Sequence, residues 1–226
     1  MLDADEAAAF RGVGRLNIAG ARFCTATLIS PVVVVTAAHC LYHPRTGARV
    51  ADDELRFVAG YRVREWAAVR RVTATAVDPA YAFEARATYA GVGADLAIGR
   101  LDRPVPESVL PFATGDIADG PPLSIVSYAQ DRPNAPSIET PCAIVERTGD
   151  LVFALDCGVN FGASGSPLFQ GEGGEHRLVG VVSAMGRLIR PPVDVTFGRV
   201  LGDLAPLIAG LTEIPPAEAL SPRPRP

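Results

Sequence analysis

Short apolar segments separated by glycine and proline are the feature that most constrains the fold of this chain. The sequence holds 22 glycines and 20 prolines, and both residue types interrupt regular elements and favour turns. Residues 32–35 are four consecutive valines, a run that is typical of a strand with no solvent-facing side. With 48% apolar residues, the chain has enough material for a packed interior. The pattern indicates an all-β protein.

Twelve segments have the length and composition of strands, and they fall into two groups of six. Residues 102–122 lie between the groups and contain five prolines and two glycines, which makes this segment the best linker candidate. The close spacing of the first six predicts a small closed barrel, and a second β unit follows the linker. The predicted strands cover residues 15–18, 23–28, 32–37, 55–59, 67–77, 95–101, 123–129, 137–145, 151–155, 167–170, 178–183 and 195–200.

The hydrophobic period changes after the last predicted strand. Apolar residues then recur at helical spacing, and Asp203 is a candidate N-cap. Pro206 is compatible with a helix because proline is tolerated in the first helical turn. This predicts a short C-terminal helix over residues 201–213. The apolar residues of that pattern are Leu201, Leu204, Ile208 and Leu211.

The termini and the two groups of strands predict five parts. Residues 1–12 are polar and alanine-rich, and we expect a loosely held arm. The first barrel would span residues 13–112 and the second 113–200, followed by the helix at 201–213. Residues 214–226 end in alternating proline and arginine, which predicts a disordered tail.

The charge of the chain argues against two classes of partner. A net charge of -4 and a pI near 5.4 give no general attraction to nucleic acid or to an anionic membrane. No stretch is long and apolar enough to be a membrane span. We therefore expect neither nucleic acid nor membrane as a partner, and we expect a monomer.

The four cysteines are spaced as two pairs. Cys24 and Cys40 are sixteen residues apart, and Cys142 and Cys157 are fifteen apart, which favours two disulfides. Because disulfides persist in oxidising compartments, this indicates a secreted or periplasmic protein. Four reduced, buried cysteines in a cytosolic protein are the alternative.

The N-terminus does not decide between these compartments. The residues after Met1 include Asp3, Asp5 and Glu6, and they lack the basic and apolar regions of a signal peptide. We expect either that a signal segment has been removed or that the protein stays inside the cell.

Three local motifs contain residues suited to acyl transfer. His39 ends the segment Thr36-Ala37-Ala38-His39, Asp95 begins an apolar strand, and Ser164 lies between glycines just before a strand. A serine hydroxyl needs a nearby base to attack at neutral pH, and histidine suits that task. Asp95 would orient the imidazole and stabilise its protonated form. The N–H groups of Gly162 and Ser164 would form the oxyanion hole.

Other readings of these residues are weaker. His39 and His43 are four apart and Cys40 lies between them, but the segment lacks the glutamate of the helical zinc-protease motif and follows a strand. Asp78 and Asp102 could compete with Asp95 as the acid. Asp95 is preferred because the apolar strand after it would bury its carboxylate behind the histidine.

Over residues 12–210 the sequence resembles the trypsin/chymotrypsin family, which has the same order of His, Asp and Ser. The resemblance implies two six-stranded antiparallel β-barrels with the active site between them, and His39, Asp95 and Ser164 as the catalytic triad. It also implies a bridge between Cys24 and Cys40 beside the histidine. Gly180-Val181-Val182-Ser183 resembles the family strand whose serine bonds the triad aspartate and whose backbone pairs with the substrate.

The chain departs from the animal digestive enzymes before the nucleophile. Those enzymes place there an aspartate that pairs with a new N-terminus after zymogen cleavage, whereas this chain has Ala163. The departure predicts an oxyanion hole that forms without N-terminal processing, as in many bacterial relatives.

The resemblance also implies a primary specificity pocket. Gly158 would lie near its floor, with Phe161, Ala184 and Gly186 on its walls. The floor position holds no acid, which favours a small or apolar residue before the scissile bond. The alternative is Asp194, which lies where the family sometimes supplies an acid from another strand and which would favour Lys or Arg.

These inferences together predict a serine endopeptidase that hydrolyses protein or peptide substrates through an acyl-enzyme. The reaction needs no metal and no cofactor. The alternative is a catalytically silent member of the same fold that acts as a binding or scaffold protein.

Overall fold

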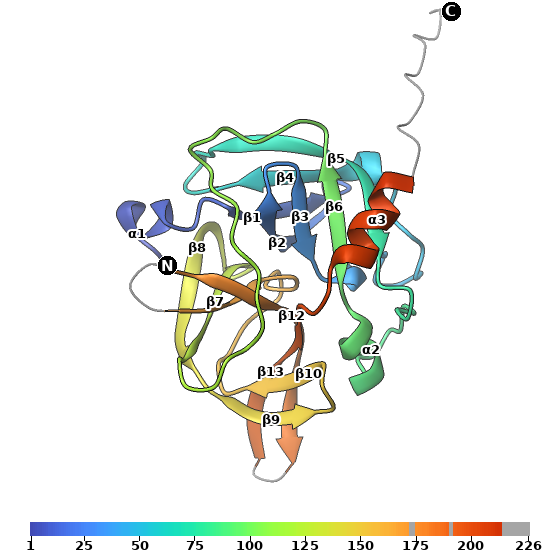
Figure 1. Ribbon diagram of the computed structural model, residues 1–226, viewed down its shortest axis with the longest axis vertical. Helices are drawn as coiled ribbons and strands as arrows, with labels where there is room; N and C mark the ends of the chain where they lie inside the picture. The colour runs from blue at the N-terminus through green and yellow to red at the C-terminus, as the bar shows by residue number, and fades with distance from the viewer. Residues whose placement is uncertain (172–174, 190–191, 214–226) are drawn as a thin grey trace, which may run out of the picture.

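The computed structural model describes residues 1–171, 175–189 and 192–213 (Figure 1). The tail predicted at residues 214–226 lies outside the described residues. Two β units dominate the molecule, and the pairings between its described strands are antiparallel. The predicted all-β class is confirmed.

The first β unit is a closed six-stranded barrel, as predicted. Its order is β1-β2-β3-β6-β5-β4, and its interior is filled by a cluster that includes Leu16, Leu28 and Phe57. The four valines lie in and just before β3, the shortest barrel strand, and Val34 and Val35 are buried. The strands are β1 (Val13–Ile18), β2 (Arg22–Ser30), β3 (Val33–Thr36), β4 (Leu55–Ala59), β5 (Ala68–Val77) and β6 (Ala97–Leu101).

The second unit is a sheet with the order β8-β7-β11-β12-β13-β10-β9. It has seven strands instead of six because the segment predicted at residues 137–145 is divided at Ala143 into two strands. These two strands form the opposite edges of the sheet, so one nearly continuous stretch of chain runs from edge to edge. The strands are β7 (Leu123–Ala129), β8 (Arg132–Cys142), β9 (Ile144–Thr148), β10 (Val152–Leu155), β11 (Pro167–Gln170), β12 (Arg177–Ile189) and β13 (Pro192–Val200).

The N-terminal arm is more firmly held than the sequence predicts. It contains a short helix, α1 (Ala4–Ala8), which begins with a reciprocal capping box between Asp3 and Glu6. The apolar residues on either side, Leu2 and Phe10, are buried. The expectation of a loosely held arm is wrong because these two side chains belong to the core cluster that spans both β units.

Two further helices flank the sheets. The short helix α2 (Tyr89–Ala94) is capped by the Thr88 side chain and ends immediately before Asp95. The predicted C-terminal helix is confirmed as α3 (Ala205–Glu213), although it begins at Ala205 and not at residue 201 as predicted. The Asp203 carboxylate accepts a hydrogen bond from the Ala205 N–H, and α3 packs against β5 and β6 (Figure 1). Two 3-10 turns, η1 (Ala38–Leu41) and η2 (Asp52–Glu54), complete the assigned helical elements of the described residues.

The hairpin between β4 and β5 contacts the second unit through hydrogen bonds that its own backbone groups form. Val63 and Arg64 are the central residues of its tip and have φ angles of 47° and 69°. The Val63 N–H donates to the Asn134 carbonyl at 2.6 Å, and the Tyr128 hydroxyl donates to the Tyr61 carbonyl at 2.8 Å. The tip is therefore held in place although its two central residues adopt the left-handed conformation that favours glycine or asparagine.

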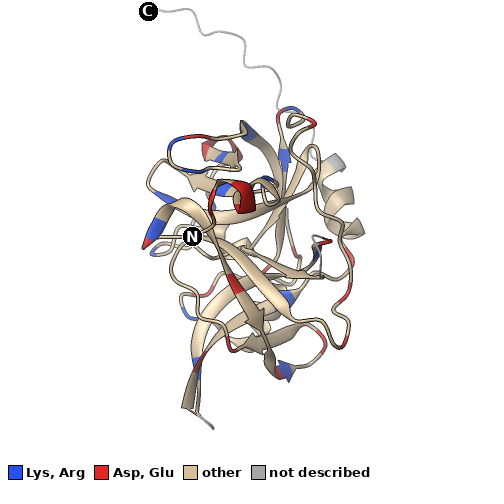
Figure 2. Ribbon diagram, turned by 90° about the vertical axis from the view of Figure 1, so that its left-hand side faces the viewer, with Lys and Arg blue, Asp and Glu red and all other residues tan. Residues whose placement is uncertain are grey.

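Both expected disulfides are present. Cys24 is bonded to Cys40 within the first unit, and Cys142 to Cys157 within the second. Figure 2 shows acidic and basic residues interspersed over the face that it presents. Among the described residues, no helix has the length and apolar character required to cross a membrane.

Candidate active site

The predicted catalytic residues gather in a cleft between the two β units. His39, Asp95, Ser164 and Ser183 all line one cavity of about 440 Å³. His39 lies in η1 directly after β3, Asp95 follows α2, and Ser164 belongs to the turn before β11. A larger hollow of about 630 Å³ lies among residues 117–123 and 141–147 and is lined by other residues.

Asp95 holds His39 by two hydrogen bonds. Its Oδ2 lies 2.7 Å from the imidazole Nδ1, and its Oδ1 accepts the backbone N–H of His39 at 2.8 Å. The Ser183 hydroxyl donates to the same Oδ2 at 2.5 Å. The Asp95 residue is only 3% exposed, so these three donors replace water around its carboxylate. The carboxylate is thereby fixed in position and fixes the imidazole in turn.

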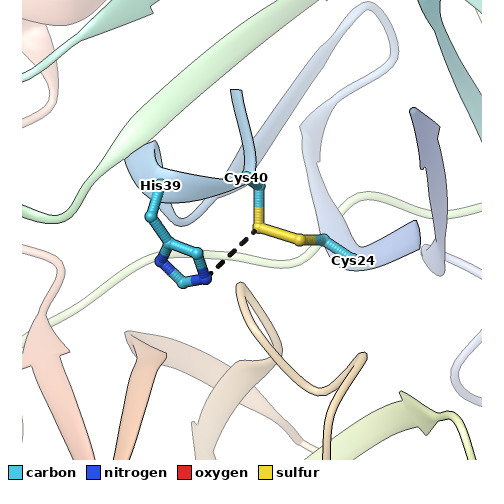
Figure 3. Close-up of side chains that lie close together, drawn as sticks. All are labelled: Cys24, His39 and Cys40. Atoms are coloured by element: carbon cyan, nitrogen blue, oxygen red, sulfur yellow. Dashed lines mark hydrogen bonds between the residues drawn. A yellow bond between two sulfur atoms is a disulfide. The ribbon is translucent and has the colours of Figure 1, made fainter. Parts of the chain in front are cut away.

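The second nitrogen of His39 faces the Cys24–Cys40 disulfide. Figure 3 marks the contact of 3.9 Å between its Nε2 and the Cys40 Sγ. When Nδ1 donates to Asp95 in a neutral imidazole, Nε2 carries no proton, and a disulfide sulfur carries none either. The contact is then packing alone, and Nε2 keeps its lone pair for another donor.

The Ser164 hydroxyl shares the cleft with the imidazole but is not bonded to it. Within the described part of the chain, Ser164 Oγ has no hydrogen bond to His39. The structure therefore joins His39 and Asp95 directly and brings Ser164 only into the same cavity. Catalytic serine–histidine bonds are often long or poorly aligned in ligand-free enzymes and tighten when substrate binds.

The turn that carries Ser164 depends on glycine at two positions. Gly162 and Gly165 have φ angles of 95° and 75°. A Cβ on Gly165 would lie 2.1 Å from Thr36 Oγ1 and 2.4 Å from the Thr25 carbonyl oxygen. Only glycine therefore fits there. Among the described residues, no acceptor is bonded to the N–H of Gly162 or of Ser164, which leaves both amides free for an oxyanion.

Thr25 connects the first barrel to this turn, and sequence reasoning missed it. Its N–H donates to the Ser164 carbonyl at 2.9 Å, and its hydroxyl donates to the Gly162 carbonyl at 3.1 Å. The same hydroxyl accepts the Tyr128 N–H at 3.1 Å. Thr25 is fully buried. A threonine inside a predicted strand carries no local signal for such a role.

The two other acids considered for the triad have different partners. Asp78 forms an ion pair of 2.9 Å with Arg199, whose pKa is lowered chiefly by burial. Asp102 pairs with the exposed Arg71 at 3.3 Å. Asp95 is the one of the three that contacts the imidazole, in agreement with the preference drawn from the sequence.

The residues predicted for substrate binding are only partly brought together. Phe161, Ser183 and Ala184 line the cleft, and Phe161 is 65% exposed. Gly158 and Gly186 lie outside its lining. A Cβ on Gly186 would lie 2.6 Å from the Phe197 ring, so this ring already fills the space beside Gly186.

Sequence reasoning missed a further wall of the cleft. The connection before α2, residues 81–88, lines the cavity from the first unit, and Val159 and Met185 line it from the second. Asp194 lies elsewhere, on an exposed hairpin, where it pairs with Arg187 at 3.2 Å. Nothing in the pattern of residues 81–88 distinguishes them from an ordinary loop.

Cys24, His39 and Cys40 offer three potential metal-binding atoms within 4.8 Å of one another. The two sulfurs are joined in a disulfide. A cysteine sulfur binds a metal as the thiolate, and neither sulfur of a disulfide is a thiolate, so the proximity of these three residues is explained by the bridge beside the histidine.

The fold and the cleft define the class: a β protein of two units, with a carboxylate-bound histidine and a serine turn in the cleft between them. Residues 24–181 match the family model described as a trypsin-like peptidase domain. The chain belongs to this trypsin-like peptidase family. A search of curated protein sequences finds no match.

Solved structures of proteases share the fold. A Glu endopeptidase in complex with MPD has a TM-score of 0.70 at 18% identity, covering 90% of this chain and 89% of that one. The thermostable serine protease AL20 from an extremophilic microorganism has a TM-score of 0.67 at 18% identity, covering 91% and 99%. Protease Anisep from Arthrobacter nicotinovorans has a TM-score of 0.63 at 16% identity, covering 89% and 93%.

Proposed function

We propose that the protein is a serine endopeptidase that acts through an acyl-enzyme. The Ser164 Oγ attacks the scissile carbonyl carbon while its proton passes to His39 Nε2. The C–N bond then breaks, and the imidazolium returns the proton to the leaving amine. Water repeats the sequence to release the acid and restore Ser164. The N–H groups of Gly162 and Ser164 stabilise the oxyanion in both steps.

The Asp95–His39 pair is the observation that carries this proposal. A buried carboxylate bonded to Nδ1 fixes the tautomer in which Nε2 is a base. Ser183 supports the same carboxylate from the second unit. The N–H groups of Gly162 and Ser164, which have no acceptor in the described part of the chain, supply the donors that a developing oxyanion needs.

We further propose that activity requires no N-terminal cleavage. Ala163 is fully buried and offers no carboxylate to a new N-terminus. The serine turn is held instead by hydrogen bonds from the Ala163 N–H to the Asn160 carbonyl and from the Gly165 N–H to the Val182 carbonyl.

The cleft favours an apolar residue before the scissile bond. Val159, Phe161, Ala184 and Met185 contribute apolar surface to it, and Asp194 is not among the residues that line it. Because both disulfides are formed, we also propose that the protein is secreted to an oxidising compartment. We propose that it acts there as a monomer that cleaves proteins.

Labelling with a fluorophosphonate probe tests the nucleophile. We expect the wild-type protein to be labelled, because the probe reacts only with an activated serine, and we expect no labelling of Ser164→Ala. Ser166→Ala is the matched control: Ser166 is two residues away and its buried hydroxyl has no partner among the described residues. Equal labelling of Ser164→Ala and wild type would exclude Ser164 as the nucleophile.

A silent fold that binds peptides without cleaving them is the second candidate. The absence of a hydrogen bond from Ser164 Oγ to His39 within the described structure favours it. The same experiment separates the two functions, because a silent protein would resist the probe while remaining folded.

A further inference from the structure

The outer face of the first barrel carries a groove across strands β1, β4 and β5. The strand register places Arg15, Val58 and Val69 side by side in one row. Asn17 and Arg56 are paired in the next row, two residues along β1 and β4. Because side chains alternate across a strand, both rows project from the same face.

Two aromatic side chains from the β4–β5 hairpin complete this groove. Tyr61 and Trp66 line it together with the two rows, and it encloses about 330 Å³. Trp66 is 56% exposed. An exposed tryptophan beside a hollow of this kind offers a flat apolar surface to a bound side chain.

The groove holds positive charge without an acidic partner. Within the described part of the chain, neither Arg15 nor Arg56 has a carboxylate at ion-pair distance. Arg15 donates to the Pro133 carbonyl at 3.1 Å, while its Nε has no acceptor among the described residues. Burial lowers its pKa, which is the expected cost of a desolvated charge without a counter-ion. A carboxylate in the groove would offset that cost.

One aromatic ring separates the groove from the catalytic cleft. The Arg15 guanidinium carbon lies 4.1 Å from the centroid of the Phe23 ring. Phe23 also lines the cleft, and its ring fills the space that a Cβ on Gly162 would occupy. Phe23 therefore contacts both the cleft and the Arg15 side chain of the groove, so a polypeptide that left the cleft across Phe23 would approach Arg15.

We propose that this groove binds a carboxylate-bearing, partly apolar segment of the polypeptide substrate, away from the scissile bond. Arg15 and Arg56 attract the carboxylate, which arginine's planar fork suits well, and Trp66 packs against a neighbouring apolar side chain. The assignment of the occupant as substrate rests on the proposed peptidase function. The binding itself does not require catalysis.

Trp66 is the chain's single tryptophan, so intrinsic emission reports directly on the groove. We would titrate full-length Ser164→Ala with a hexapeptide of alternating phenylalanine and glutamate, and with the same peptide containing glutamine. We expect a saturable change in emission, and affinity at least about tenfold weaker for the glutamine peptide. Equal affinities, or no change in emission, would overturn the proposal.

Arginine variants locate the binding. Arg56→Gln should weaken the glutamate peptide about tenfold, and so should Arg15→Gln if that variant folds. Arg187→Gln is the matched control, since it removes an exposed arginine from the second unit and should leave the affinity unchanged. Equal weakening by Arg187→Gln would show nonspecific attraction and reject the groove.

Peptide hydrolysis by the protein with Ser164 intact tests whether the segment bound in the groove belongs to the substrate. A substrate extended by an acidic segment should have a higher kcat/KM than one extended by its glutamine counterpart, and Arg56→Gln should remove most of that difference. If fluorophosphonate labelling fails while the titration succeeds, the peptidase function is wrong and the groove remains a peptide site. The reverse pattern rejects the groove alone.

Discussion

Gly165 shows how closely a single position can be constrained in this site. It has a left-handed backbone and no room for a Cβ beside Thr36 and Thr25. We expect Gly165→Ala to lower the free energy of unfolding by about 2–5 kcal/mol, from backbone strain and overpacking together, and to reduce probe labelling. Urea denaturation measures the first effect.

Gly202→Ala provides the control for that substitution. Gly202 also has a positive φ, of 64°, but nothing lies within 4 Å of its Cβ position. Only the backbone strain remains, so the loss should be about 1–2 kcal/mol with labelling preserved. Equal losses in both variants would mean that the crowding around Gly165 is relieved by movement.

Site residues that lie in a distinctive local sequence motif could be predicted, and those without such a motif could not. His39, Asp95 and Ser164 each occur in a distinctive local sequence, and the structure places all three in one cleft. Thr25 and Arg199 act through partners that are distant in sequence. Their roles follow from the packing of strands, which a single sequence does not specify.

At the scale of elements, the tip of the β4–β5 hairpin contains the wrong residue for its conformation. Val63 is β-branched, has a φ of 47° and is 60% exposed. Val63→Gly should therefore stabilise the protein by about 0.5–1 kcal/mol, because the strain that it relieves exceeds the entropy that glycine costs. Thermal unfolding measures the shift.

A valine-to-glycine substitution in an ordinary strand should change the stability in the opposite direction. Val145 is similarly exposed, at 46%, but lies in β9 without positive φ. Val145→Gly should destabilise by about 1 kcal/mol. A loss of stability in both variants would contradict the strain assigned to the hairpin.

Most strands could be predicted because alternating or continuous apolar segments end at glycine and proline. The division of residues 137–145 could not, since at Ala143 the chain changes its pairing partner from β7 to β10, which are distant in sequence from each other. The helix in the N-terminal arm, residues 1–12, was not predicted, although Asp3 and Glu6 have the spacing of a capping box. Its five-residue helix depends on burial of the flanking Leu2 and Phe10, which composition alone does not indicate.

At the scale of the molecule, Thr25 joins the two units. Thr25→Val keeps the shape of the side chain but leaves the Gly162 carbonyl and the Tyr128 N–H without their buried partner. We expect a loss of about 1–3 kcal/mol and a lower kcat, measured by urea denaturation and peptide hydrolysis.

Thr27→Val is the matched control on the same strand. Thr27 is equally buried, and its hydroxyl has no partner among the described residues. Removing that hydroxyl should be neutral or stabilising. If Thr25→Val behaved in the same way, the link between the units would not depend on these hydrogen bonds.

The two disulfides each join residues of the same β unit, Cys24 with Cys40 and Cys142 with Cys157. Neither crosslink spans the interface, so residues 102–122 are the covalent tether between the unit that contains His39 and Asp95 and the unit that contains Ser164. Such a tether acts by raising the effective concentration of one half for the other. The cleft is therefore formed by two units that associate within one chain. The fraction of molecules in which the cleft is assembled depends on the affinity between these two β units.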